Sequence, residues 1–170
     1  MKNTKKSDKK SGFTLIEILV VIGIIAILAA IVIIAINPAK QFAQARNTQR
    51  QAGVNSILNA IGQRIADNKG VFSGTFVVGS ASYTCGPIPT SSTTTISSLM
   101  ANDTTTPTGN LGCLVPTYIS SLPVDPDSSV VAPSTGFDVI VDNAGRIKVC
   151  ASLAANETSI PSAGAICVTR

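Results

Sequence analysis

A nearly uninterrupted apolar run close to the N-terminus limits what this chain can fold into more than any other feature. From Phe13 to Ile36 the only charged residue is Glu17, and the 19 residues from Ile18 to Ile36 are uncharged. As an α-helix at about 1.5 Å per residue, that stretch is roughly 28 Å long, close to the hydrocarbon thickness of a bilayer. The sequence therefore predicts a membrane-spanning helix over residues 13–37.

Lysines in front of this run set the orientation that we expect. The first twelve residues carry a charge of +4, from Lys2, Lys5, Lys6, Lys9 and Lys10 less Asp8, and the whole chain also has +4. Positive residues beside an apolar helix stay on the cytoplasmic side, so the remainder of the chain is expected to be exported. The same basic residues could contact DNA, but their position in one tail favours a role in topology instead.

Two ordinary explanations of the run leave something unexplained. A secretory signal peptide has an apolar region of about 7–15 residues and then a small-residue cleavage site, which Ala35–Ala39 matches poorly. A plain anchor fits the length, although an acid at mid-bilayer costs on the order of 3 kcal/mol. One turn inside the run, Glu17 could reach toward the headgroups, but plain anchoring gives no reason for its presence.

The residues around Glu17 form a recognisable motif. Ser11-Gly12-Phe13-Thr14-Leu15-Ile16-Glu17-Ile18-Leu19-Val20-Val21 resembles the type III signal of type IV prepilins and type II secretion pseudopilins. The resemblance implies that a prepilin peptidase removes residues 1–12 by cutting between Gly12 and Phe13, and that it N-methylates Phe13. It also implies that Glu17 pairs with the Phe13 amine of a neighbouring subunit and so sets the register of a filament.

The resemblance has consequences for partners and location. It implies a filament with copies of the same chain and other pilins, an inner-membrane assembly platform, and a single-pass membrane form with its N-terminus inside. The filament would be an extracellular pilus, or a periplasmic or cell-wall-spanning pseudopilus. The functions left open are a type IV pilus subunit for adhesion, motility or DNA uptake, a pseudopilin of a type II secretion or competence system, and a membrane-anchored binding domain that does not polymerise.

The composition argues against catalysis. The chain has no His, which removes the commonest general base and the commonest zinc ligand. No nucleophile–base constellation is visible in the sequence. We therefore expect no enzymatic activity and no cofactor.

A second, amphipathic helix is expected over residues 38–69. Asn37-Pro38 ends the apolar run and should kink or break the helix. Apolar residues then recur at three- and four-residue steps, which predicts one face packed on a core; they are Val54, Ile57, Leu58, Ile61 and Ile65. The arginines at 46, 50 and 64 are expected on the surface. Asn68-Lys69-Gly70 is a typical stop signal.

Residues 70–170 are predicted to form an exported, β-rich domain. Phe137–Asp142 and Arg146–Leu153 flank the turn residues Asp142–Gly145 and indicate a hairpin. Ala165–Thr169 is a third candidate strand, and Val71–Val78 is either a strand or an extended connector. Thr90–Thr108 is expected to be a surface loop, with a short helix near Ile96–Ala101. The fold class is thus α+β: a long N-terminal helix packed on a small antiparallel sheet, as in pilins.

Four cysteines lie on the exported side. No Cys-x-x-Cys pair occurs among Cys85, Cys113, Cys150 and Cys167, which argues against a zinc or redox motif. An even number of cysteines in an exported domain predicts two disulfides. Three connectivities are possible. We favour Cys85–Cys113, which closes the Ser/Thr-rich loop, and Cys150–Cys167, which joins neighbouring strands.

One further segment bears on metal binding. Leu114-Val115-Pro116-Thr117-Tyr118-Ile119-Ser120-Ser121-Leu122-Pro123-Val124-Asp125-Pro126 resembles a segment of pseudopilin-like globular domains, some of which bind calcium just after it. Asp125 and Asp127, with Asp138 and Asp142, are available oxygen ligands. There is no EF-hand spacing, and Asp-Pro-Asp-Ser is equally typical of a turn, so no metal site is assigned.

Overall fold

The computed structural model describes residues 12–98 and 109–170, and the chain divides after Pro38 into two compact units. The lysines of the expected leader lie outside the described residues. The first unit contains helix α1 (Leu15–Ala35), none of whose residues is buried. Ile36 leaves the helix with an extended backbone, and Pro38 begins the next helix. Asn37 lies between them, and helical geometry is disfavoured there because the next residue is a proline. The break expected at Asn37-Pro38 is therefore present.

Helix α2 (Pro38–Asp67) begins the second unit and carries the expected apolar row. Val54, Ile57, Leu58 and Ile61 are buried, and Ile65 packs against the same core. The helix ends where the stop signal predicted. Lys69 and Gly70 have positive φ angles (54° and 92°), and the Gly70 N–H donates to the Ile65 carbonyl at 2.8 Å.

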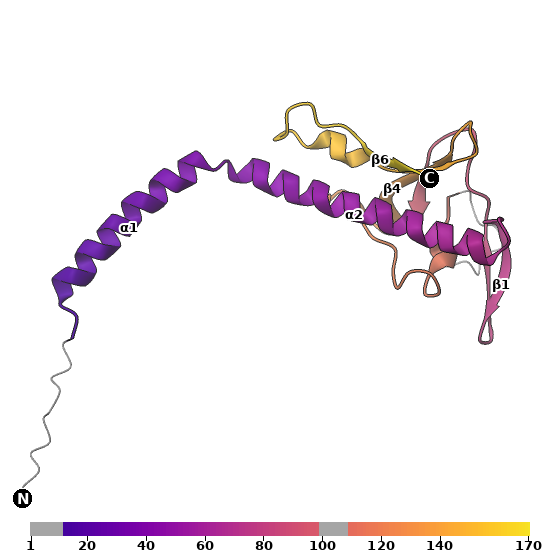
Figure 1. Ribbon diagram of the computed structural model, residues 1–170, viewed down its shortest axis with the longest axis horizontal. Coiled ribbons are helices and arrows are strands. Elements are labelled where there is room, and N and C mark those ends of the chain that lie inside the picture. The colour runs from indigo at the N-terminus through magenta and orange to yellow at the C-terminus, as the bar shows by residue number, and fades with distance from the viewer. Residues whose placement is uncertain (1–11, 99–108) are drawn as a thin grey trace, which may run out of the picture. The chain divides into compact units, whose positions relative to one another are not determined.

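A four-stranded antiparallel sheet forms the centre of the domain, in the order β3-β4-β5-β6. Its strands are β3 (Thr94–Ser97), β4 (Ser134–Val141), β5 (Ile147–Ala151) and β6 (Ile166–Thr169). β4 and β5 form the predicted hairpin, in which Val141 pairs with Ile147 across the Asp142–Gly145 turn. β6 is the predicted third strand. The α+β layout of a long helix with antiparallel sheets, consistent with a pilin-like fold, is confirmed (Figure 1).

The Ser/Thr-rich segment differs from the prediction. Thr94–Ser97 is a strand rather than part of a loop, and it pairs with β4. Ile96 is fully buried there and belongs to the core, which explains why this short polar segment pairs with the sheet. The short helix expected near Ile96–Ala101 is wrong for its first two residues, which are in β3; its part beyond residue 98 lies outside the described residues.

A second, two-stranded sheet follows α2. β1 (Gly74–Val78) and β2 (Ala81–Cys85) form a hairpin, so the strand alternative for this segment is correct. Two short 3-10 helices, η1 (Gly112–Leu114) and η2 (Ser152–Asn156), complete the domain. One core joins the apolar row of α2 to residues of both sheets and of η1.

The prediction that the arginines of α2 lie on the surface is wrong for two of the three. Arg50 and Arg64 are buried, and only Arg46 remains partly exposed. The guanidinium of Arg64 donates to the carbonyls of Phe72 (3.3 Å) and Gly74 (3.2 Å) and lies 4.3 Å from the centroid of the Phe76 ring. Burial of a cation is tolerated here because each arginine has found acceptors.

Candidate functional site

The first turn of α1 is built around Thr14 and Glu17. Thr14 is the N-cap, and its hydroxyl accepts a hydrogen bond from the Glu17 N–H at 3.3 Å. In return, one oxygen of the Glu17 carboxylate accepts from the Thr14 N–H at 3.4 Å. This reciprocal pair is a capping box, which satisfies two N–H groups that the helix cannot pair internally. A negative charge in the first turn is also favoured by the helix dipole.

Sequence reasoning missed this local role of Glu17. The signal was present, since a Thr followed three residues later by Glu just before an apolar run is typical of a capping box. Glu17 thus has one partner inside its own helix. A carboxylate can accept about four hydrogen bonds, so capacity remains for a second, positively charged partner.

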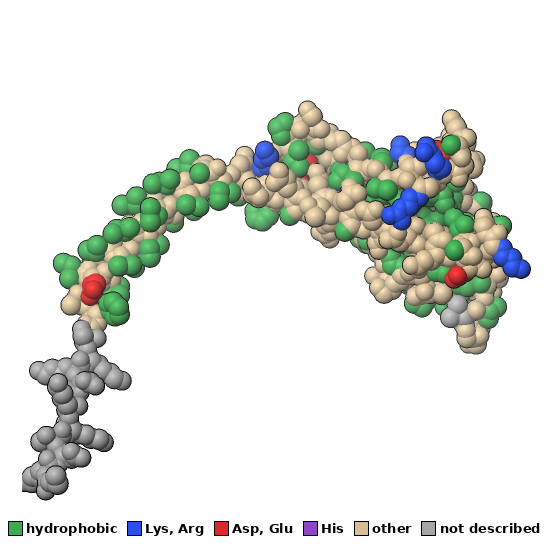
Figure 2. Space-filling view, in the orientation of Figure 1, with side chains coloured by type: hydrophobic (Ala, Val, Ile, Leu, Met, Phe, Trp, Pro, Cys, Tyr) green, Lys and Arg blue, Asp and Glu red, His purple; other side chains and the backbone are tan. Residues whose placement is uncertain are grey.

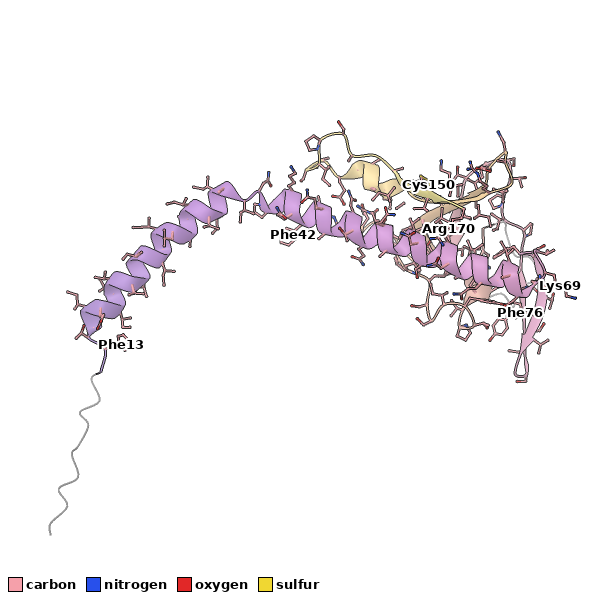
Figure 3. The ribbon with its side chains drawn as sticks, viewed as in Figure 1. Phe13, Phe42, Lys69, Phe76, Cys150 and Arg170 are labelled. Carbon is pink, nitrogen blue, oxygen red and sulfur yellow. A yellow bond between two sulfur atoms is a disulfide. The ribbon has the colours of Figure 1, made fainter. Side chains whose placement is uncertain are left out.

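The residues on either side of the expected cleavage point are accessible. Gly12 is exposed, and a Cβ placed on it would meet no atom within 4 Å. Phe13 is 82% exposed, and Figure 3 places it at the start of α1. None of the described residues therefore covers the peptide bond between Gly12 and Phe13, and an enzyme can reach it.

Helix α1 has exposed apolar side chains along its whole length, and Figure 2 shows those on the face in view. It is the one helix among the described residues that is long and apolar enough to span a membrane. An apolar helix with no buried residue requires cover from outside its own unit, by lipid or by other helices. The arrangement can therefore serve either as an anchor or as one member of a helix bundle.

The cysteines form the two pairs that we favoured. Cys85 of β2 is bonded to Cys113 of η1, with 5.4 Å between their Cα atoms. Cys150 and Cys167 are direct partners across β5 and β6, with 4.1 Å between their Cα atoms.

The four aspartates considered for calcium do not converge. Both carboxylate oxygens of Asp125 accept from the buried Arg50, at 2.8 and 2.9 Å. Asp127 accepts from the N–H and hydroxyl of Ser129, and these bonds lower the pKa of Asp127. Asp138 accepts from two hydroxyl groups, and Asp142 lies in the β4–β5 turn. No group of three or more His, Cys, Asp or Glu that could hold a metal gathers within residues 12–98 and 109–170.

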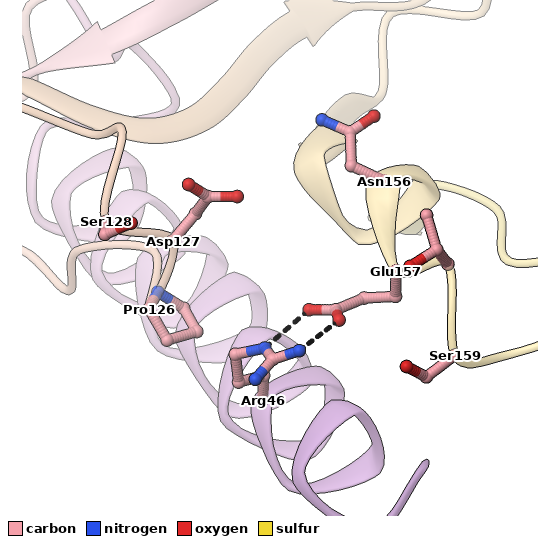
Figure 4. Close-up of a pocket in the computed structure, with 8 residues that line it drawn as sticks. Arg46, Pro126, Asp127, Ser128, Asn156, Glu157 and Ser159 are labelled. Atoms are coloured by element: carbon pink, nitrogen blue, oxygen red, sulfur yellow. Dashed lines mark hydrogen bonds and ion pairs between the residues drawn. The ribbon is translucent and has the colours of Figure 1, made fainter. Parts of the chain in front are cut away.

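A buried ion network was not foreseen from the sequence. Arg50 lies between Asp125 and Glu157, and its Nη1 reaches a Glu157 oxygen at 2.5 Å. Figure 4 shows both oxygens of Glu157 directed at the guanidinium of Arg46, one turn earlier on α2. The hydrogen bonds from Arg46 and then Arg50 outweigh burial and lower the pKa of Glu157 to about 2. An open pocket of about 300 Å³ lies beside this pair and includes Asp127 and Asn156.

Comparison with known families gives one result. Residues 7–33 match the model of the prokaryotic N-terminal methylation motif, which is the signal of type IV prepilins and pseudopilins. The match spans the accessible Gly12–Phe13 bond, the capping box and most of α1, and it ends before the domain. No curated protein and no solved structure matched the chain.

Proposed function

We propose that this protein is a structural subunit of a type IV pilus, processed by a prepilin peptidase and assembled through its N-terminal helix. One observation carries the proposal: an accessible Gly12–Phe13 bond is followed by an apolar helix with its sole acid in the first turn. The methylation motif at the same residues supports the pilin and pseudopilin class in general.

In the proposed processing step, the lysines, Gly12 and Phe13 each have a separate role. The peptidase removes residues 1–12 at the cytoplasmic face, where the lysines hold the scissile bond. Gly12 offers no side chain that could obstruct the cut. The cut leaves Phe13 with a positively charged, N-methylated amine at the end of an apolar helix, and residues 13–37 remain in the membrane.

Assembly then needs a partner for each of two charges. In a bundle of apolar helices, an unpaired Glu17 carboxylate or Phe13 amine carries a large desolvation cost. Pairing the carboxylate of one subunit with the amine of its neighbour removes both costs at one axial position. The pair therefore sets the register and penalises misplaced subunits.

The domain supports an exported position. Two disulfides in a domain of this size are typical of proteins that function in an oxidising compartment. The role that we propose for residues 38–170 is to be displayed on the filament surface, with no catalytic activity and no cofactor.

A pseudopilin of a type II secretion or competence system is the second candidate. The observation that favours it is the Leu114–Pro126 segment, which resembles a segment of pseudopilin-like domains and supplies the buried Asp125. Both candidates share every feature of the N-terminus, so the filament itself must be observed.

The test is to express the full chain in a bacterium with a pilus assembly system and to examine sheared surface material by electron microscopy and mass spectrometry. Long filaments whose subunits begin at methylated Phe13 would support the pilus subunit. Processed subunits without surface filaments would favour the pseudopilin, and subunits that still begin at Met1 would contradict both. A Gly12→Leu variant is the control, because its subunits should remain uncut.

A further inference from the structure

We propose that the first half of α2, Pro38–Ala52, is a separable segment that a buried ion network fastens to the domain. We call this network the charge lock; it consists of Arg46, Arg50, Asp125 and Glu157. The second half of α2 is held differently, by the hydrophobic core. The first half can therefore separate from the domain while the second half stays in place.

The burial pattern along α2 gives the first argument. In this helix, all of whose residues the structure describes, Pro38–Ala52 buries only Ala43 and Arg50. Every large apolar side chain that α2 buries comes later, beginning with Val54. Ala43 removes little apolar surface from water, so the hydrophobic effect contributes little to docking of the first half.

The geometry of the charge lock gives the second argument. Nε and Nη2 of Arg50 donate to the two oxygens of Asp125 at 2.8 and 2.9 Å, the bidentate arrangement that fixes both groups most firmly. Nη1 of Arg50 donates to Glu157 and also to Asn47 on its own helix, at 2.9 Å. Arg46 adds a second pair of bonds to Glu157.

The two acids belong to different parts of the domain. Asp125 lies in the segment before β4, and Glu157 directly follows η2. Each has a side chain at most 6% exposed. The lock therefore fastens the first half of the helix to two segments that are distant in sequence, through the buried Arg50, Asp125 and Glu157 and the partly exposed Arg46.

Such a lock opens as a unit. A buried ion pair that loses one member leaves an uncompensated charge behind. That charge has a lower free energy in water than in the closed lock. The closed position of the whole segment therefore becomes unfavourable at once. Segment 38–52 would then separate over about 22 Å of helix, at about 1.5 Å per residue, while the core from Val54 onward stays closed.

This device concerns the domain alone and does not depend on the proposed function. In any chain that is loaded through its N-terminal helix, force reaches the charge lock before it reaches the core. Opening of the lock then lets Pro38–Ala52 extend from the domain without unfolding the sheet.

Hydrogen exchange of the full chain in detergent micelles tests the proposal. Glu157→Ala removes one acid and leaves the Arg50–Asp125 pair in place. We expect amides of residues 41–52 to exchange at least tenfold faster than in the parent protein, and amides of residues 54–65 to change less than twofold. Arg146→Met is the matched control, because it removes an exposed ion pair with Asp142 in the β4–β5 turn, outside the charge lock, and should change neither window.

Two results would overturn the proposal. Equal acceleration in both windows would mean that α2 and the domain open as one cooperative unit. A change of less than twofold in residues 41–52 would mean that the lock does not hold this segment. If Glu157→Ala does not fold, the nearly isosteric Glu157→Gln is measured against the same two criteria.

Discussion

At the scale of single residues, Glu17 has two tasks that different substitutions can separate. Its carboxylate caps its own helix through Thr14, and in the proposed filament its charge pairs with a neighbour's Phe13 amine. Gln can occupy this position of a capping box, but it carries no charge. Loss of the Thr14 hydroxyl has the opposite effect, since it weakens the cap and leaves the charge.

We therefore predict that Glu17→Gln is cleaved and methylated normally, yet yields at least tenfold fewer filaments than the parent chain. Thr14→Ala should cost the helix start about 1 kcal/mol and still assemble. Mass spectrometry of the N-terminus measures cleavage, and filament yield after shearing measures assembly. Normal filaments from Glu17→Gln would contradict the register role.

Two glycines of α2 provide a second prediction at this scale. A Cβ on Gly53 would lie 2.7 Å from Cζ of the buried Phe137, whereas a Cβ on Gly62 would meet nothing within 4 Å. Alanine is favoured over glycine in a helix by about 1 kcal/mol. Gly62→Ala should therefore raise the free energy of unfolding by about 0.5–1 kcal/mol.

For Gly53→Ala the overlap should outweigh the gain in helix propensity, because overpacking a core costs about 1–3 kcal/mol. We expect a net loss of stability in urea unfolding of the full chain. The fluorescence of Tyr83 and Tyr118 reports on this transition, since both side chains pack against the core and the chain has no Trp. Equal stabilisation by the two variants would show that Phe137 yields to the methyl group.

At the scale of elements, each disulfide joins a short element to its neighbour. Cys85–Cys113 ties the two-stranded sheet to η1, and Cys150–Cys167 fastens the four-residue strand β6 to β5. β6 forms an edge of its sheet and is paired on one side only. Both bonds therefore stabilise elements that are short for independent pairing.

Replacing either pair with serines should lower the free energy of unfolding by about 3–4 kcal/mol, because the bonds close loops with sequence separations of 28 and 17. Urea unfolding of each double variant measures the loss. Peptide mapping without reductant should recover Cys85 with Cys113 and Cys150 with Cys167. Crossed pairs or free thiols would contradict this arrangement.

At the scale of the whole molecule, stability should depend on pH through the charge lock. Folding lowers the pKa of Glu157 from 4.5 to about 2, so the folded protein holds this carboxylate ionised more strongly than the unfolded chain does. The stabilisation is complete above about pH 4.5 and is lost as the pH falls toward 2. Its upper limit is about 3–4 kcal/mol, at 1.4 kcal/mol per pKa unit.

We predict that urea midpoints of the parent protein fall steadily between about pH 4.5 and 2, and that Glu157→Gln flattens this part of the profile. The lowered pKa values of Asp127 and Asp142 contribute in the same direction, so a residual slope is expected in the variant. An identical slope in both proteins would show that Glu157 does not carry the dependence.

Features encoded by neighbouring residues could be predicted from the sequence. The apolar span, the break at Pro38, the row from Val54 to Ile61 and the β4–β5 hairpin are all marked by the spacing of residues close in the chain. Periodicity and turn residues give this information directly. The motif at Gly12–Glu17 is local in the same sense, and it carries the proposed function.

Only the tertiary structure decided which distant residues meet. Arg50 finds Asp125 and Glu157 at sequence separations of 75 and 107, and Thr95 of β3 pairs with Asp138 of β4. No periodicity indicates a counterion or a strand partner at such a separation, so the sequence predicts surface positions for the isolated arginines and a loop where the structure has β3. Local sequence patterns are thus enough to predict a membrane-spanning helix and the bond at which the chain is expected to be cut. The fold decided how the second helix is fastened to its domain, because a buried charge is stable only where folding brings its partner.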